Sequence, residues 1–79
     1  MHGWIHVGAA GLEKGHGVKA GDRIRAHHPV YGDVEGTVRS VHRNGNLVAN
    51  LHSSSRGFGV QPGVALHRSS VTAFRKGEG

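Results

Sequence analysis

The sequence predicts an all-β domain of about five short antiparallel strands. Apolar and polar residues alternate over residues 23–28, as they do in a strand with one buried face. Asn44-Gly45 stands between two apolar stretches and is typical of a hairpin turn. Fourteen glycines and two prolines among 79 residues indicate many turns. These features favour short strands joined by tight turns over a helical fold.

Residues 1–19 are predicted to form a glycine-rich N-terminal arm, because five glycines argue against a stable helix in this segment. The stretch from Trp4 to Val7 is apolar enough for a short strand, and we expect it to dock Trp4 or Ile5 on the domain. The domain itself is expected to span residues 20–75. A frayed tail is expected at residues 76–79.

The first strand of the domain is expected to end near His28, because Pro29 cannot donate a hydrogen bond to a neighbouring strand. Ile24 and Ala26 share its apolar face. The polar face carries the basic residues Arg23, Arg25 and His27. Asp22, directly before the strand, is expected to accept a hydrogen bond within its own turn.

The second strand, over about residues 34–42, is expected to be strongly bent. Val41 is out of phase with Val38, and a bulge near Arg39-Ser40 would return Val41 to the buried face. Such a bend needs a position that carries no side chain, and Gly36 supplies it. The first two strands are therefore expected to form the bent pair of which small barrels are made.

The remaining elements follow from turn residues and alternation. Asn44-Gly45 predicts a type I′ turn with positive φ at both residues, followed by a strand over residues 47–52. A short strand at residues 58–61 precedes a predicted Pro62-Gly63 turn, and a 3₁₀ turn at residues 67–70 precedes a last strand at residues 71–74. The expected core comprises Ile24, Val38, Val41, Leu47, Ala49, Leu51, Val64 and Leu66, with Phe74 at one end.

The net positive charge lies in the second half of the chain. Residues 1–35 contain four basic and four acidic residues, whereas residues 36–79 contain six basic residues and one acid, Glu78. Seven of the ten basic residues are arginines, whose planar guanidinium suits phosphate. The alternative is a solvated surface, but this distribution favours an anionic partner, above all RNA or DNA.

The candidate nucleic-acid contacts are arginines expected to converge near the Asn44-Gly45 turn. Such arginines contact the phosphate backbone without reading its sequence. Tyr31, in a glycine-flanked loop, is expected to be exposed and to stack on a base, while Phe58 suits either stacking or capping the core. The complete candidate set is Arg39, Arg43, Arg56, Arg68 and Tyr31.

No catalytic site, metal site or cofactor is predicted. The eight histidines lack the paired spacing of a zinc site, and no cysteine is present. The serines near histidines lack a nucleophile elbow or an oriented acid. No apolar stretch is long enough to span a membrane, and no signal-peptide core follows Met1, so no membrane partner and a cytoplasmic location are expected.

The run Gly21-Asp22-Arg23-Ile24-Arg25, followed by Gly36-Thr37-Val38-Arg39-Ser40-Val41 and a hairpin, resembles the SH3-like barrels. Among these it is most similar to the KOW-type modules of ribosomal proteins and transcription elongation factors. The resemblance covers about residues 20–52, and residues 64–74 are compatible with a closing turn and strand. It implies a small SH3-like barrel. Because SH3-like barrels also bind peptides and other partners, a protein-interaction or assembly adaptor, self-association included, stays open as the alternative.

One enzyme family shares the opening run. The small plasmid-borne, trimethoprim-resistant dihydrofolate reductases are SH3-like tetramers with a similar Gly-Asp-Arg-Val-Arg start and a Val-Gln-Ile-Tyr segment that lines their pore. Here Val60-Gln61 is followed by Pro62-Gly63, and Ala26 stands in place of the basic residue that follows their opening run. This activity is therefore the third hypothesis, and a non-enzymatic protein is expected.

Overall fold

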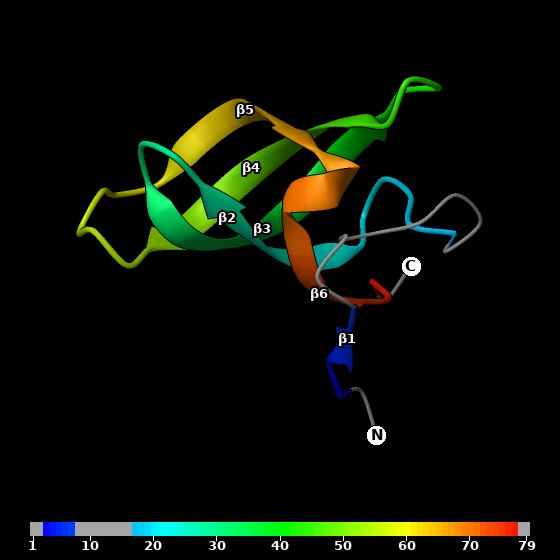
Figure 1. Ribbon diagram of the computed structural model, residues 1–79, viewed down its shortest axis with the longest axis horizontal. Coiled ribbons are helices and arrows are strands. Elements are labelled where there is room, and N and C mark those ends of the chain that lie inside the picture. Colours follow the sequence, from blue (N-terminus) through cyan, green and yellow to red (C-terminus); the bar gives the residue numbers. More distant parts are fainter. Residues whose placement is uncertain (1–2, 8–16, 78–79) are drawn as a thin grey trace.

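The computed structural model describes residues 3–7 and 17–77, which form one antiparallel sheet of six strands (Figure 1). The strands are β1 (Ile5–His6), β2 (Arg23–His28), β3 (Gly32–Val41), β4 (Asn46–Ser54), β5 (Gln61–His67) and β6 (Val71–Arg75). A 3₁₀ turn, η1 (Arg68–Ser70), joins β5 to β6. The predicted all-β class is confirmed. The strand beyond the expected five is β1, which lies in the N-terminal arm.

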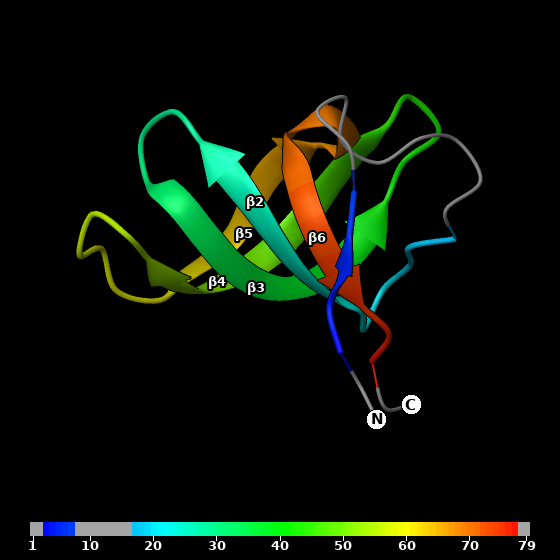
Figure 2. The same cartoon turned by 60° about the horizontal axis from the view of Figure 1, so that its bottom comes forward.

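The sheet curls back on itself. Its strand order is β1-β6-β2-β3-β4-β5, so three strands separate β5 from β6. In a flat sheet this arrangement would place them roughly 19 Å apart. Yet η1 has three residues, and a 3₁₀ turn advances only about 2 Å per residue. The end of β5 must therefore lie close to the start of β6, as the coiled sheet in Figures 1 and 2 shows.

Two irregularities bend β3 against β4. The pairing register shifts at residues 35–36 and again at residues 38–40. The second shift is the predicted bulge. At the first, a Cβ on Gly36 would overlap the carbonyl oxygen of Asn50 and lie 3.0 Å from the Cα of Leu51. Gly36 thus occupies a place where the backbone of β4 leaves no room for a side chain, as the sequence predicts.

The core lies on the inner face of this curled sheet. Val64, expected in the core, is half-buried against the core cluster. The prediction that Val41 is buried is wrong, because this residue is 44% exposed. Val41 occupies the last position of β3, next to the projecting β3–β4 turn, so the bulge does not suffice to bury it. The confirmed core residues are Ile24, Val38, Leu47, Ala49, Leu51, Leu66 and Phe74. Ala26, Val34, Val71 and Ala73 are buried as well.

The turn between β3 and β4 is not the predicted type I′ turn. Every positive φ among the described residues belongs to a glycine, so only Gly45, at φ 89°, is left-handed and Asn44 is not. The N–H of Gly45 donates to the carbonyl of His42 (3.1 Å), and the N–H of His42 donates to the carbonyl of Asn46 (2.9 Å). Residues 43–45 therefore form a three-residue loop that ends in a left-handed glycine.

This geometry predicts unequal effects for the two turn residues. Gly45→Val should lower the free energy of unfolding by more than about 1 kcal/mol, because a β-branched residue is strained at positive φ. Asn44→Ala should cost less, since it removes only the exposed hydrogen bond that the Asn44 Oδ1 accepts from the N–H of Asn46 (3.1 Å). Urea unfolding of both variants measures the difference. Equal losses would contradict the three-residue loop.

β5 runs through Pro62-Gly63, where a turn was predicted, and residues 58–60 lie outside any strand. An edge strand tolerates proline because its outward N–H groups need no partner within the sheet. Gly63, at φ 66°, donates its N–H to the side-chain oxygen of Asn50 (2.9 Å) instead of to the backbone of β4. Because β5 lies at the edge of the sheet, residues 62 and 63 form part of an irregular strand and not the predicted turn.

Asp22 joins the start of β2 to the C-terminal segment. Its carboxylate is buried and accepts the N–H of Lys19 (3.1 Å), which is the expected bond within its own turn. It also accepts the N–H of Gly77 (3.0 Å) and the Nζ of Lys76 (3.1 Å). A single side chain thus holds two chain segments that are distant in sequence.

Candidate nucleic-acid interface

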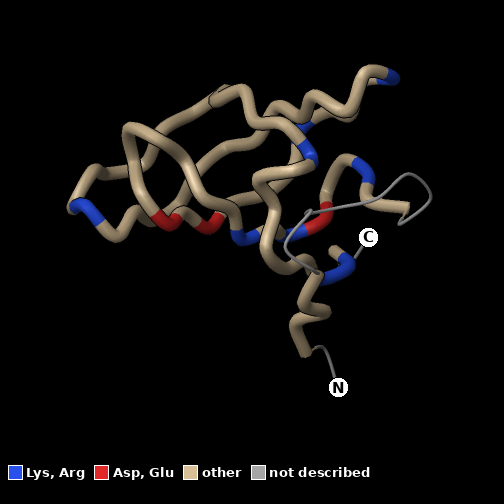
Figure 3. Tube along the Cα trace, viewed as in Figure 1, with Lys and Arg blue, Asp and Glu red and all other residues tan. Residues whose placement is uncertain are grey.

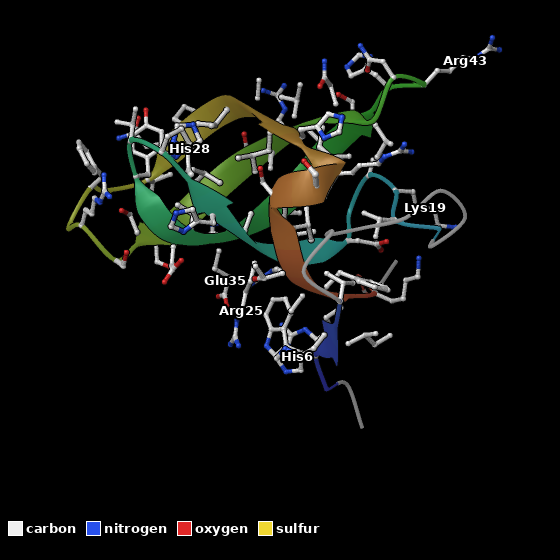
Figure 4. All side chains as sticks on the ribbon, viewed as in Figure 1. His6, Lys19, Arg25, His28, Glu35 and Arg43 are labelled. Carbon is white, nitrogen blue, oxygen red and sulfur yellow. The ribbon has the colours of Figure 1, made fainter. Side chains whose placement is uncertain are left out.

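Two of the predicted arginines flank the β3–β4 turn. Arg43 is the first residue of the loop, and its exposed side chain points away from the sheet (Figure 4). Arg68 opens η1 and donates its N–H to the carbonyl of Gly45 (2.8 Å). Its side chain covers Gly45, because a Cβ at that position would lie 3.0 Å from the Cδ of Arg68. One backbone hydrogen bond therefore brings Arg68 to the turn that carries Arg43.

His67 sets the position of η1. Its Nδ1 accepts the N–H of Ser69 (3.2 Å) and lies 2.8 Å from the hydroxyl oxygen of Ser69. Because a backbone N–H can only donate, Nδ1 carries no proton in this arrangement, and the proton of the neutral ring is on Nε2. That Nε2 faces Gly45, at 3.0 Å from the place of a Cβ there. The imidazole thus presents a hydrogen-bond donor beside the Arg68 side chain.

Arg39 lies at the bulge of β3 and is exposed. Its guanidinium extends to β5, because a Cβ at Gly63 would lie 3.6 Å from its Nη1. Arg39 and Arg43 are four residues apart on one hairpin, and η1 brings Arg68 to the turn of that hairpin. We call Arg39, Arg43 and Arg68 the turn-end arginines.

Arg56 does not join this cluster. Arg56 follows the last residue of β4, whereas Arg43 precedes its first residue and Arg68 is hydrogen-bonded to the turn there, and the nine residues of β4 span roughly 25 Å. Figure 3 shows basic residues in the loops at both ends of the sheet. The Nη1 of Arg56 donates to the carbonyls of Pro29 (2.9 Å) and Val30 (3.1 Å). Its guanidinium therefore ties the β4–β5 loop to the β2–β3 turn.

The expectation that Tyr31 is exposed is wrong. Its ring is half-buried against the core, with ring centroids 4.6 Å from His28 and 5.0 Å from Phe58. The Nδ1 of His28 accepts the N–H of Val30 (3.0 Å) and that of Tyr31 (3.3 Å), so the turn itself folds the tyrosine inward. Phe58, at 43% exposed, is the more accessible of the two rings.

A second basic surface, absent from the predicted set, covers the outward face of β1, β6 and β2. Arg23 stands directly opposite Arg75 in the β2–β6 register, and Arg25 follows two residues along β2. Trp4 packs against two of these guanidinium groups, with its ring centroid 4.2 Å from the Cζ of Arg25 and 5.1 Å from that of Arg75. We call Arg23, Arg25 and Arg75 the face arginines. Alternation over residues 23–28 predicts that Arg23 and Arg25 share a face, but only strand pairing adds Arg75.

Among the described residues, the carboxylates form ion pairs with residues other than the turn-end arginines. Asp22 pairs with Lys76 (3.1 Å), Asp33 with the imidazole of His27 (2.9 Å), and Glu35 with Arg25 (3.1 Å). The sequence has no Asp or Glu between residues 36 and 77. Within the part of the chain that the structure describes, the positive field of the turn-end arginines is therefore not neutralised by an ion pair.

Within residues 3–7 and 17–77, no group of three or more His, Asp or Glu side chains is placed to hold a metal ion. No helix in the described part of the chain is long and apolar enough to cross a membrane. Comparison with protein-family models, curated proteins and solved structures finds no match for this chain. The resemblance to KOW-type SH3-like barrels stays a prediction from the sequence.

Proposed function

We propose that the chain is a non-enzymatic nucleic-acid-binding module that contacts the phosphate backbone. The supporting observation is the uncompensated positive charge of the turn-end arginines, since no acidic residue occurs between residues 36 and 77. Guanidinium groups bind phosphate oxygens through two parallel hydrogen bonds. The Nε2 of His67 adds a donor at the same turn. Such contacts supply affinity that does not depend on base sequence.

The groups that the described residues expose favour backbone contact over base reading. The described residues contain no α-helix that could enter a major groove, and Tyr31 is folded inward. The β3–β4 turn instead presents Arg43 at a projecting tip (Figure 4), and Arg68 is held at the same turn by its hydrogen bond to the carbonyl of Gly45. The proposal is therefore for binding with little sequence preference, to RNA or to DNA.

Salt dependence tests the proposal. Fluorescence-anisotropy titrations with duplex DNA, single-stranded DNA and RNA at several salt concentrations should give log affinity falling linearly with log salt, because bound arginines release counterions. Arg39→Gln with Arg43→Gln should weaken binding to all sequences alike. The same pair of changes should flatten the slope by up to about two units.

Lys19→Gln is the control, because Lys19 is exposed and belongs to neither the β3–β4 turn nor η1; Figure 4 labels it. This variant removes one positive charge from outside the proposed site, so it should change affinity less than about twofold. Failure to bind any of the three nucleic acids more tightly than about 100 μM at low salt would refute the function. Binding that survives the double arginine change would refute this site.

One observation favours a protein-interaction module as the second candidate. Val30, Phe58 and Val60 are 54%, 43% and 66% exposed. Phe58 packs on Tyr31, which follows Val30 in the chain, and the carbonyl of Val30 accepts a hydrogen bond from Arg56. Apolar surface therefore lies at the loops opposite the β3–β4 turn. Exposed apolar patches mark interaction sites. Sedimentation of the chain and of Phe58→Ser over a range of concentrations tests it, because self-association through this surface should weaken in the variant.

A further inference from the structure

We infer that the face arginines form a second phosphate-binding surface, which a nucleic acid strand crosses on the outward side of β1, β6 and β2. This inference rests on the proposed function and extends it to a surface remote from the β3–β4 turn. The register of β2 and β6 sets Arg23 directly opposite Arg75. Like charges at directly opposed positions of an antiparallel pair repel one another. A bound anion would remove that repulsion.

The carboxylates of the described residues leave this charge available. Asp22 pairs with Lys76, and Asp33 pairs with His27. Glu35 contacts Arg25 through Nε at 3.1 Å, which leaves both terminal nitrogens of that guanidinium outside the ion pair. Within the described residues, neither Arg23 nor Arg75 has a carboxylate partner. The face therefore has donors for an added anion.

Trp4 holds two of these donors in place. The guanidinium groups of Arg25 and Arg75 both lie against its ring, a contact that restricts the two side chains. Ordering before binding lowers the entropy cost of capturing a ligand. Because both contacts use the indole ring, we assign Trp4 to positioning the arginines and not to stacking on a base.

A hollow lined by Arg25, one of the face arginines, has room for the group that carries the phosphate. Its volume is about 450 Å³. His6 and Arg25 lie on one side of the fold together with Glu35 (Figure 4). The walls and floor are formed by His6, Arg25, Ala26, Asp33, Val34, Thr72 and Ala73. The polar atoms and small apolar side chains of this lining suit a sugar or a base attached to the bound phosphate.

Trp4 makes the inference testable, because it is the only tryptophan in the chain. A labelled oligothymidylate of about ten nucleotides reports binding by anisotropy, and the unlabelled strand is titrated while Trp4 emission is followed. The inference expects a saturable change in Trp4 emission with the same midpoint as the anisotropy. An oligoglutamate peptide of the same length should bind far more weakly, and equal affinity for it would overturn phosphate recognition.

Arg23→Gln with Arg75→Gln should lower affinity about tenfold, from the loss of two solvent-exposed charge pairs, and flatten the salt slope by about 1.4 units on a single strand. Arg43→Gln with Arg68→Gln removes the same charge from the turn and should weaken binding while the Trp4 response at saturation persists. Arg23→Gln alone is the second variant, because Trp4 packs against Arg25 and Arg75 and not against Arg23. It should still flatten the slope by about 0.7.

The outcomes separate the two proposals. Binding by anisotropy with unchanged Trp4 emission and unchanged affinity in both Arg23 variants would overturn this inference and leave the proposed function in place. Absence of binding to any nucleic acid would refute the proposed function and this inference with it. A Trp4 response that disappears in the Arg23/Arg75 variant but persists in the Arg43/Arg68 variant would support the face.

Discussion

Replacing Leu51 by alanine is expected to lower the free energy of unfolding by about 2–5 kcal/mol. Leu51 is 1% exposed and packs in the core with Ile24 and Leu47. The alanine would leave a cavity that the closely paired β3 and β4 cannot collapse to fill, because Gly36 already brings the two backbones together. A small domain has a narrow stability margin, so the variant should be largely unfolded near its normal temperature.

Val48→Ala is the matched control for this change. Val48 lies on the other face of the same strand and is only half-buried. Its truncation should cost less than about 1 kcal/mol. Urea unfolding of both variants gives the comparison. A larger loss for Val48→Ala than for Leu51→Ala would mean that β4 is displaced by one residue, which exchanges its two faces.

Asp22→Asn is expected to cost about 3 kcal/mol, the second largest loss. The carboxylate is 3% exposed and accepts hydrogen bonds from Lys19, Lys76 and Gly77. Hydrogen bonds to a charged group are worth about 1.5–3 kcal/mol each, and an asparagine keeps only one of the two acceptor oxygens. Loss of this contact should also loosen the segment after β6, which hydrogen exchange at Gly77 can follow.

The same carboxylate makes stability depend on pH. Burial of Asp22 opposes its ionisation, but hydrogen bonds from the N–H groups of Gly77 and Lys19 and from the Lys76 ammonium outweigh burial and hold its pKa below the ordinary 3.8. A lowered pKa means that the folded state binds the proton less readily than the unfolded state does. The stabilisation is therefore complete above the ordinary value and is lost as the pH falls through the folded-state pKa.

Thermal melts of the wild type and of Asp22→Asn from about pH 7 to about pH 2 should show this difference. The variant lacks the titrating group, so its deficit should shrink below about pH 4. Asp33→Asn is the control, because the Asp33 side chain is 81% exposed and pairs only with His27 at the surface. A deficit for Asp22→Asn that stays constant with pH would contradict the lowered pKa.

Alternation and turn chemistry predict most of the strands and most of the core from the sequence; the exception among the strands of the domain is β5, expected at residues 58–61 and found at Gln61–His67. Ile24 and Ala26 alternate with Arg23 and Arg25, and this pattern alone assigned the buried face of β2. The bulge at residues 38–40 followed from a break in the same pattern. These features depend on residues that are a few positions apart, so contacts with distant parts of the chain are not needed to specify them.

The errors occur where the position of a residue relative to neighbouring strands determines its environment. The bulge was expected to bury Val41, but this residue is exposed at the end of β3. Pro62 looks like a turn residue but lies in β5, because an edge strand leaves its outward N–H side unpaired. Asn44-Gly45 permits two hairpin types, and the pairing of His42 with Asn46 selects the three-residue loop.

The candidate sites divide in the same way. The sequence by itself determined the excess of arginine after residue 36 and the shared face of Arg23 and Arg25. Tertiary structure alone decided which arginines meet: η1 brings Arg68 to the turn, and β6 sets Arg75 against Arg23. Local spacing fixes the direction of a side chain relative to its own strand. The choice of neighbouring strands follows from burying a common core, which depends on contacts across the whole chain.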